Sequence, residues 1–259
     1  LAANILFNHR LNRTSIKNNL PLKLIPENIE DAYKIQNELK ILYLTLKDNY
    51  IIGKKVGCTN KIAQKQVNIF EPFYGNLFSK FCNNNGCKLK SEKFSNPFFE
   101  PEISFILKED INIKKAPFSI NDTEDLFDGM FASIEIVDFR FGNNIREVGI
   151  KNLIISNGAS EYIIKSDDIY SINKINLENQ KIYLSINDSI IEEGNTNLVL
   201  NNPLNSALWV VNKLASIGEP MLKGQFITTG SCTKAVKIEK NSKIKAFFGD
   251  LGTIEFEYL

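Results

Sequence analysis

Three glutamates in apolar surroundings carry the clearest chemical signal in the sequence. Glu100 and Glu102 lie two residues apart in the apolar run 98–107, and Glu135 lies in a second apolar run, 134–137. Because side chains alternate across a strand, Glu100 and Glu102 are expected to share one face. Ionised groups in an apolar setting need a partner, and three carboxylates suit a hard divalent ion such as Mg²⁺ or Mn²⁺. The pattern predicts a metal site.

A simpler interpretation places these glutamates on the solvated face of an amphipathic strand, where most strand glutamates lie. The neighbours of the pair are Phe99, Ile103 and Phe105, and Glu135 lies between Ile134 and Ile136. These neighbours favour two buried strands. Further along the second strand, Asp138 and Arg140 alternate away from Glu135, so we expect them to form an ion pair at the strand end, outside the site.

Composition limits the class of protein. The chain of 259 residues can bury a large core. Its 31 basic and 30 acidic residues leave a formal charge of +1, which gives no general attraction to nucleic acid or to an anionic membrane. No apolar run approaches the roughly 18 residues of a membrane span, and residues 1–13 are too polar for a signal peptide. We expect a soluble, cytoplasmic protein that acts on a small molecule.

The four cysteines do not predict a zinc site. Only Cys82 and Cys87 are close in sequence, and the chain has a single histidine, His9. The intervening Asn83-Asn84-Asn85-Gly86 segment is typical of a tight hairpin turn. We therefore expect these two cysteines to face each other across a short hairpin as thiols.

Periodicity predicts the elements that must position the glutamates. Four helices are expected: one after Pro26, one capped by Asn60 that runs through Val67, one that starts at 122–125, and one from Pro203 to Gly218. Strands are expected at 225–229, 235–239, 243–248 and 253–258. Pro101 removes a ladder N–H, which predicts an edge strand or a bulge there. Helices mixed with antiparallel strands, without a glycine-rich nucleotide motif, argue against a doubly wound nucleotide fold.

Eight short blocks in a fixed order give the chain a family resemblance. They lie at 29–36, 53–59, 74–78, 100–105, 135–140, 156–160, 203–205 and 224–231. The chain resembles the 2-keto-4-pentenoate hydratase group, with its 4-oxalocrotonate decarboxylase relatives, of the fumarylacetoacetate hydrolase superfamily. The resemblance implies an α+β fold: a mixed β-roll of the superfamily's C-terminal-domain type with packed helices. It further implies a helical N-terminal segment at 1–60, a catalytic domain at 61–259, homo-oligomers and a place in aromatic catabolism.

The resemblance also implies roles for individual residues. Glu100, Glu102 and Glu135 match the family's metal carboxylates, in agreement with the prediction from their surroundings. Lys55 matches an active-site lysine that serves acid/base chemistry or binds a carboxylate, although a surface lysine is the ordinary alternative. The segments that line the substrate pocket contain Phe73, Asn157, Ser160, Thr229 and Ser231.

Two positions depart from the family pattern. Phe73 precedes the Tyr74-Gly75 pair where the hydratases commonly have an acid, and Ser156 stands where the family often has another acid. An apolar wall at Phe73 favours a different, more apolar substrate, or a protein that manages without the acid.

These observations give one expected function and two alternatives. The expected function is a metal-dependent hydratase that adds water to a 2-hydroxy-2,4-dienoate and forms a 4-hydroxy-2-oxo acid. A metal-dependent 2-oxo acid decarboxylase and a non-catalytic 2-oxo acid binding protein are the alternatives. The superfamily's carbon–carbon hydrolases typically use a histidine, and His9 lies outside the matched region, which disfavours that activity.

Overall fold

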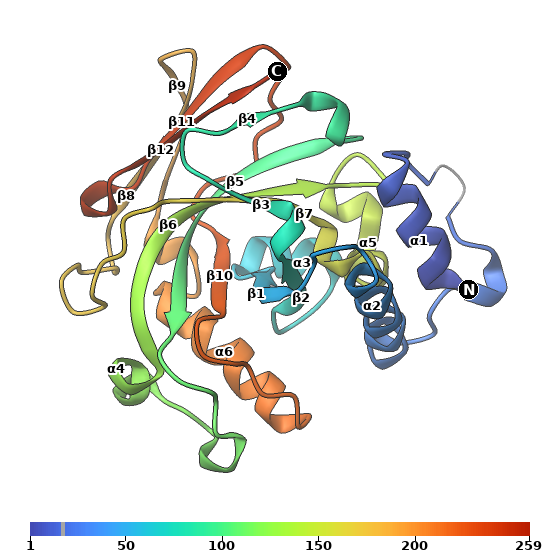
Figure 1. Ribbon diagram of the computed structural model, residues 1–259, viewed down its shortest axis with the longest axis horizontal. Helices are drawn as coiled ribbons and strands as arrows, with labels where there is room; N and C mark the ends of the chain where they lie inside the picture. The colour runs from blue at the N-terminus through green and yellow to red at the C-terminus, as the bar shows by residue number, and fades with distance from the viewer. Residues whose placement is uncertain (17–18) are drawn as a thin grey trace.

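A rolled seven-stranded sheet forms the centre of the protein. The structure, a computed structural model, describes residues 1–16 and 19–259. The strand order is β2-β1-β10-β5-β6-β7-β3 (Figure 1). The strands are β1 (Ile51–Gly57), β2 (Phe73–Phe78), β3 (Cys82–Asn84), β5 (Pro97–Leu107), β6 (Phe127–Asp138), β7 (Ser160–Lys165) and β10 (Phe226–Ser231). Only the 3-10 turn Ser79–Phe81 joins β2 to β3, although these strands lie at opposite edges, so the sheet must curl until its edges approach each other.

A second sheet covers part of the outer face of the roll. Its order is β4-β12-β11-β8-β9. These strands are β4 (Lys88–Leu89), β8 (Lys181–Ile186), β9 (Ser189–Asn195), β11 (Ser242–Phe247) and β12 (Thr253–Tyr258). The two sheets share an apolar core in which the rings of Phe99 and Phe256 lie 5.8 Å apart. The expected α+β fold is confirmed.

Six α-helices lie in the described residues. They are α1 (Ala2–Leu11), α2 (Ile29–Leu44), α3 (Lys61–Val67), α4 (Thr123–Leu126), α5 (Ile145–Ile155) and α6 (Pro203–Ser216). α1, α2 and α5 lie together at one side of the roll, and α6 packs against β10 (Figure 1). The four expected helices are α2, α3, α4 and α6. None of these six helices is long and apolar enough to cross a membrane.

Side-chain caps explain where several helices begin. Asn28 Oδ1 accepts a hydrogen bond from Asp31 N, and Asn60 Oδ1 accepts one from Ala63 N, each at 2.8 Å. Such caps satisfy backbone donors that the first turn leaves free. α5 was not predicted, because Gly149 interrupts its pattern with φ +72°. Asn144, which caps α5 through Arg146 N and Glu147 N, was the available signal.

Two expectations about strands are wrong. Residues 235–239 form no strand apart from a single bridge between Val236 and Phe99, because this segment crosses from one sheet to the other. Pro101 is not at an edge, since β5 lies between β10 and β6. The bulge lies on the partner strand β10, between Thr228 and Ser231.

The predicted hairpin between Cys82 and Cys87 is also wrong, although both are free thiols. Cys82 belongs to β3, which pairs with β7, whereas Cys87 leads into β4, which pairs with β12. The asparagine-rich turn therefore passes the chain between two sheets. Long-range pairing partners decide this outcome, and local turn chemistry does not reveal them.

A buried ion network fixes α1 to the roll. Arg10 Nε lies 3.2 Å from Glu161 Oε1, and Arg140 Nη2 lies 2.5 Å from Glu161 Oε2. Arg140 Nη2 also lies 3.2 Å from Asp138 Oδ2, which confirms the expected strand-end pair. Glu161 thus pairs with two buried guanidinium groups, that of Arg10 in α1 and that of Arg140, which follows β6.

We expect the Glu161→Gln substitution to lower the free energy of unfolding by about 3 kcal/mol, because it leaves two buried cations facing one carboxylate. Chemical denaturation followed by circular dichroism measures this change. The matched control is Glu193→Gln, at an exposed position. A loss no larger than the ~1 kcal/mol of a surface pair would contradict the importance of the network.

The expected division of the chain at residue 60 stays a prediction. β1 precedes that boundary, yet it pairs with β2 and β10 inside the rolled sheet.

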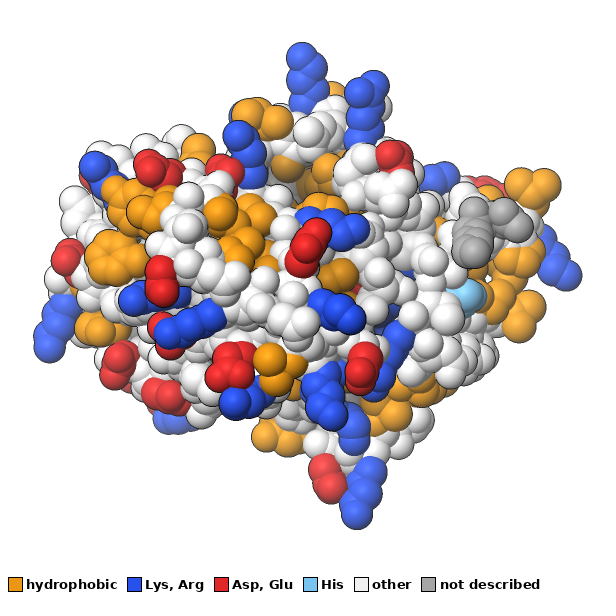
Figure 2. Space-filling model, turned by 90° about the horizontal axis from the view of Figure 1, so that it is seen from above, with side chains coloured by type: hydrophobic (Ala, Val, Ile, Leu, Met, Phe, Trp, Pro, Cys, Tyr) orange, Lys and Arg blue, Asp and Glu red, His pale blue; other side chains and the backbone are white. Residues whose placement is uncertain are grey.

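On the face shown in Figure 2, side chains of both charge signs are interspersed. No large patch of one sign covers that face.

Candidate functional site

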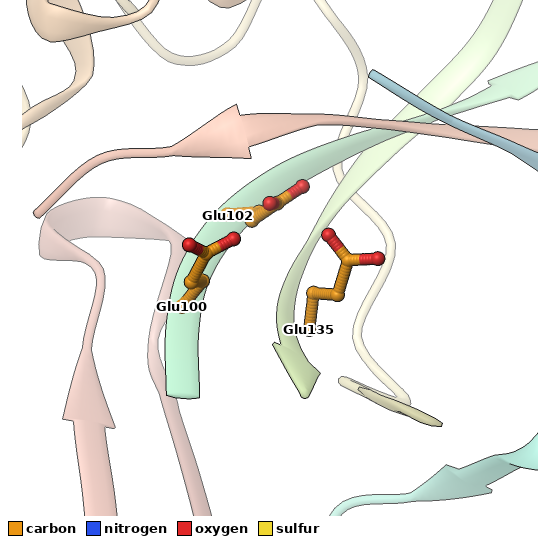
Figure 3. Close-up of side chains that lie close together, drawn as sticks. All are labelled: Glu100, Glu102 and Glu135. Atoms are coloured by element: carbon orange, nitrogen blue, oxygen red, sulfur yellow. The ribbon is translucent and has the colours of Figure 1, made fainter. Parts of the chain in front are cut away.

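The inner face of the rolled sheet brings the three glutamates together. Glu100 pairs with Glu135 across β5 and β6, and Glu102 pairs with Ser133. Cross-strand partners project to the same side of a sheet, so all three carboxylates point into one space (Figure 3). One oxygen of each lies within 4.8 Å of the others. The structure therefore brings together the three glutamates from which the sequence predicts a metal site.

The carboxylates are buried and incompletely bonded. Glu102 and Glu135 are fully buried, whereas Glu100 is half-buried. Glu102 Oε2 accepts a hydrogen bond from Gly230 N at 2.9 Å. Among the described residues, Glu102 Oε1 and Glu135 Oε1 have no hydrogen-bond partner. Free, buried carboxylate oxygens are the ligands that a hard divalent cation takes, so these residues fit such an ion.

Lys55 on β1 supplies the positive charge at the site. Its Nζ lies 3.0 Å from Glu135 Oε2, and both side chains are buried. Burial by itself lowers the pKa of Lys55, but the negative charges of Glu135, Glu100 and Glu102 outweigh it and raise that pKa above its ordinary value. Without a bound cation, the three carboxylates thus favour the ammonium form of Lys55.

Burial also changes the glutamates. It raises the pKa of Glu100 to about 7, against the opposing charge of Lys55 and with support from Glu135. Burial, Glu135 and Glu100 raise the pKa of Glu102 well above its usual range. Without a cation, the folded protein thus holds protons that the unfolded chain would release.

We expect the metal-free protein to lose stability as the pH rises from 4.5 to about 7, the interval between the ordinary and the raised pKa of Glu100. The unfolded chain binds fewer protons than the folded protein over this interval, so rising pH favours unfolding. Saturating Mg²⁺ should remove this loss of stability, because its positive charge then balances the negative charge of the carboxylates. Thermal unfolding across this interval, with chelator and with Mg²⁺, measures both curves. In the control variant Glu100→Gln, the metal-free protein should lose less stability over the same interval. A stability of the metal-free wild type that increases with pH would contradict the expectation.

Phe73 on β2 forms a wall beside Lys55. It pairs with Gly57 of β1, and Lys55 Nζ lies 5.4 Å from the centre of its ring. A Cβ atom on Gly57 would come within 2.4 Å of Phe73 Cζ, and one on Gly158 within 3.0 Å of Phe73 Cε2. The two glycines therefore leave the space that the ring fills.

The other predicted pocket residues differ in what their side chains do. Asn157 Oδ1 accepts from Asn76 N at 2.7 Å, and its Nδ2 donates to Asn76 O at 2.8 Å, which fixes the turn Asn157–Ala159 to β2. Thr229 Oγ1 donates to Ile103 O at 2.8 Å. Ser231 pairs with Glu102 and is half-buried, and Ser160 is buried at the start of β7. Asn157 and Thr229 are thus bonded to backbone groups.

A row of hydroxyl groups next to the carboxylates was not predicted. Thr228 pairs with Lys55 on one side and with Ser104 on the other. The hydroxyls of Ser104 and Ser133 lie 2.7 Å apart, and the buried Thr228 Oγ1 has no partner. Alternation could have revealed two of them, because Ser104 follows Glu102 by two residues and Ser133 precedes Glu135 by two.

Comparisons with known proteins find similar enzymes. The 2-keto-4-pentenoate hydratase of Burkholderia vietnamiensis is 26% identical over 225 residues, which cover 86% of this chain and 83% of that protein. A solved 4-oxalocrotonate decarboxylase from Pseudomonas putida G7, complexed with magnesium and adipate, is 26% identical, with a TM-score of 0.91 over 100% of this chain and 96% of that one. The chain is related to the 2-keto-4-pentenoate hydratase and 4-oxalocrotonate decarboxylase group. No family model matches it.

The wider superfamily shares the fold. A solved fumarylacetoacetate hydrolase family protein from Yersinia pestis, described as putative, is 12% identical and has a TM-score of 0.58 over 82% of this chain and 95% of that one. At that identity the likeness concerns the fold alone. The β-roll and the helices at its side therefore form a fumarylacetoacetate hydrolase-type fold.

Proposed function

We propose that this protein is a divalent-metal-dependent hydratase that adds water to a 2-hydroxy-2,4-dienoate and forms a 4-hydroxy-2-oxo acid. The observation that supports it is the convergence of Glu100, Glu102 and Glu135, with free buried oxygens, beside the ammonium of Lys55. Mg²⁺ or Mn²⁺ held by the three carboxylates would neutralise the charge that develops on the substrate's 2-oxygen.

Lys55 binds the substrate carboxylate in this proposal. Its ammonium group is held at the site by β1 and by its ion pair with Glu135. Phe73, Gly75 and Gly158 lie beside its aliphatic chain and restrict where the ammonium can point. A fixed ammonium group orients the acid end of the substrate, and orientation of this kind lowers the entropic part of the barrier.

A decarboxylase of 2-oxo acids is the second candidate. The likeness to the solved 4-oxalocrotonate decarboxylase, which extends over the whole chain, favours it. Decarboxylation requires an electron sink at the 2-oxo group and no water at a distant carbon, so the absence of an acid at Phe73 would matter less. Phe73 also motivates the third candidate, a protein that binds 2-oxo acids without turnover.

Ultraviolet absorbance distinguishes these functions. 2-Hydroxypenta-2,4-dienoate is mixed with metal-free protein, and Mg²⁺ or Mn²⁺ is then added. Loss of the dienol absorbance that depends on the metal, with formation of a 4-hydroxy-2-oxo acid, supports the hydratase. No change with either metal contradicts it. Carbon dioxide release from 4-oxalocrotonate would then support the decarboxylase, and calorimetric binding of oxalate without turnover would support the binding protein.

A further inference from the structure

We propose that Phe73 makes the site select 2-oxo acids, or their enols, that carry one carboxylate and an uncharged apolar tail, and makes it reject dicarboxylic acids of equal length. The inference rests on the proposed function, because it assumes that the acid end of the substrate binds at Glu100, Glu102, Glu135 and Lys55. It adds the chemical class of the remainder of the substrate.

The surroundings of the carboxylates are polar on one side and apolar on the other. Ser104, Ser133 and Thr228 form the hydroxyl row on the polar side. In the other direction along β6, Val137 follows Glu135 by two residues and lies on the same face. Val137 belongs with Phe73 to one buried apolar cluster. A substrate whose acid end is held at the carboxylates can therefore direct its tail toward an apolar wall.

Among the described residues, the buried cationic side chains offer no free partner for a second carboxylate at the site. Four cationic side chains are buried in the described part of the chain: Arg10, Lys54, Lys55 and Arg140. Arg10 and Arg140 are paired with Glu161. Lys54 alternates to the outer face, where its Nζ lies 2.9 Å from Glu219 Oε1. Only Lys55 lies at the site, and the acid end of the substrate already requires it.

The wall has room to adjust to a large tail. A cavity of about 430 Å³ lies beside Phe73, lined also by Tyr33, Ile150 and Ile154. A side chain that borders an empty volume can shift into it without overpacking its neighbours. An alkyl or aryl tail could thus displace the Phe73 ring and contact the apolar residues of this lining, whereas a terminal carboxylate there would face the carboxylate of Glu71 and no cationic lining residue.

The first test compares two acids of the same chain length, 2-oxohexanoate and 2-oxoadipate, by calorimetry on the Mg²⁺-loaded protein. Oxalate has no tail, so its binding reports the metal and the acid-end site alone. We expect 2-oxohexanoate to bind about 10-fold tighter than 2-oxoadipate, or more, since a buried charge without a partner is strongly disfavoured. Equal or tighter binding of 2-oxoadipate, with oxalate still bound, would overturn this inference and leave the proposed function standing. Failure of oxalate to bind would overturn both.

A charge added at the wall should reverse the preference. In Phe73→Arg we expect 2-oxoadipate to bind tighter than 2-oxohexanoate, because its second carboxylate gains a partner. Phe73→Leu keeps an apolar wall and should keep the wild-type order. The matched control is Phe70→Arg, since Phe70 lines the same cavity but is 91% exposed. An unchanged order in Phe73→Arg, with normal circular dichroism, would show that the tail does not reach Phe73.

Discussion

Substitution of Glu102 by glutamine is expected to abolish both metal binding and turnover while the fold stays intact. Glu102 is fully buried, and one of its oxygens has no partner. Changes to groups that only contact a metal ligand weaken binding by about 10–100-fold, so loss of a charged ligand should weaken it by ~100-fold or more. The glutamine oxygen can still accept from Gly230 N, which preserves the local backbone contact.

Two measurements separate these effects. Titration with Mn²⁺, followed by electron paramagnetic resonance, gives the metal affinity, and circular dichroism reports the fold. Glu109→Gln is the matched control, because Glu109 is exposed and pairs only with the exposed Lys223. Metal affinity within a few-fold of wild type in Glu102→Gln would place the cation elsewhere.

Substitution of Lys55 by methionine is expected to separate stability from metal binding. The variant leaves three clustered carboxylates without their cation, and removing one partner of a buried pair typically destabilises a protein by about 3–5 kcal/mol. Mg²⁺ should restore this stability, because it supplies the missing positive charge. Metal should also bind tighter than in wild type, since no ammonium competes for Glu135.

Turnover should nevertheless fall in Lys55→Met by about 10²-fold or more, because the substrate loses the group that orients its acid end. Thermal unfolding with chelator and with Mg²⁺ tests the effect on stability. The Mn²⁺ titration tests the metal affinity, and the dienol assay tests turnover. Lys55→Arg, which keeps the charge, is the control for stability. Equal stability of Lys55→Met with and without Mg²⁺ would show that Lys55 does not compensate the carboxylates.

The pairing of Glu100 with Glu102 could be predicted because it depends on local alternation, whereas the long-range register of β5 against β6 places Glu135 opposite Glu100. Glu100 and Glu102 share a face in any strand, and the apolar neighbours of Glu135 indicated burial. The proximity of Lys55 had no such local signal. Lys55 reaches the site because β1 pairs in parallel with β10, and only the family resemblance suggested that contact.

The hydroxyl groups of β10 show what the sequence did not reveal. The family resemblance implies that Thr229 lies in a pocket segment, and this stays a prediction; its hydroxyl is bonded to Ile103 O, whereas that of the neighbouring Thr228 has no partner among the described residues. A bulge between Thr228 and Ser231 sets the register of β10 against β5. A shift of one residue exchanges the two faces of a strand, and the position of a bulge is decided by long-range pairing.

The distribution of the site over the sheet has a consequence for how the protein folds. β1, β5, β6 and β10 each contribute a contact at the carboxylates, and these strands come from both ends and the middle of the chain. Contacts between distant segments form slowly, because long loops must close first. Uptake of Mn²⁺ during refolding should therefore lag behind the recovery of helical signal. The ion would then report the time at which β1 and β10, which are distant in the sequence, come together in the sheet.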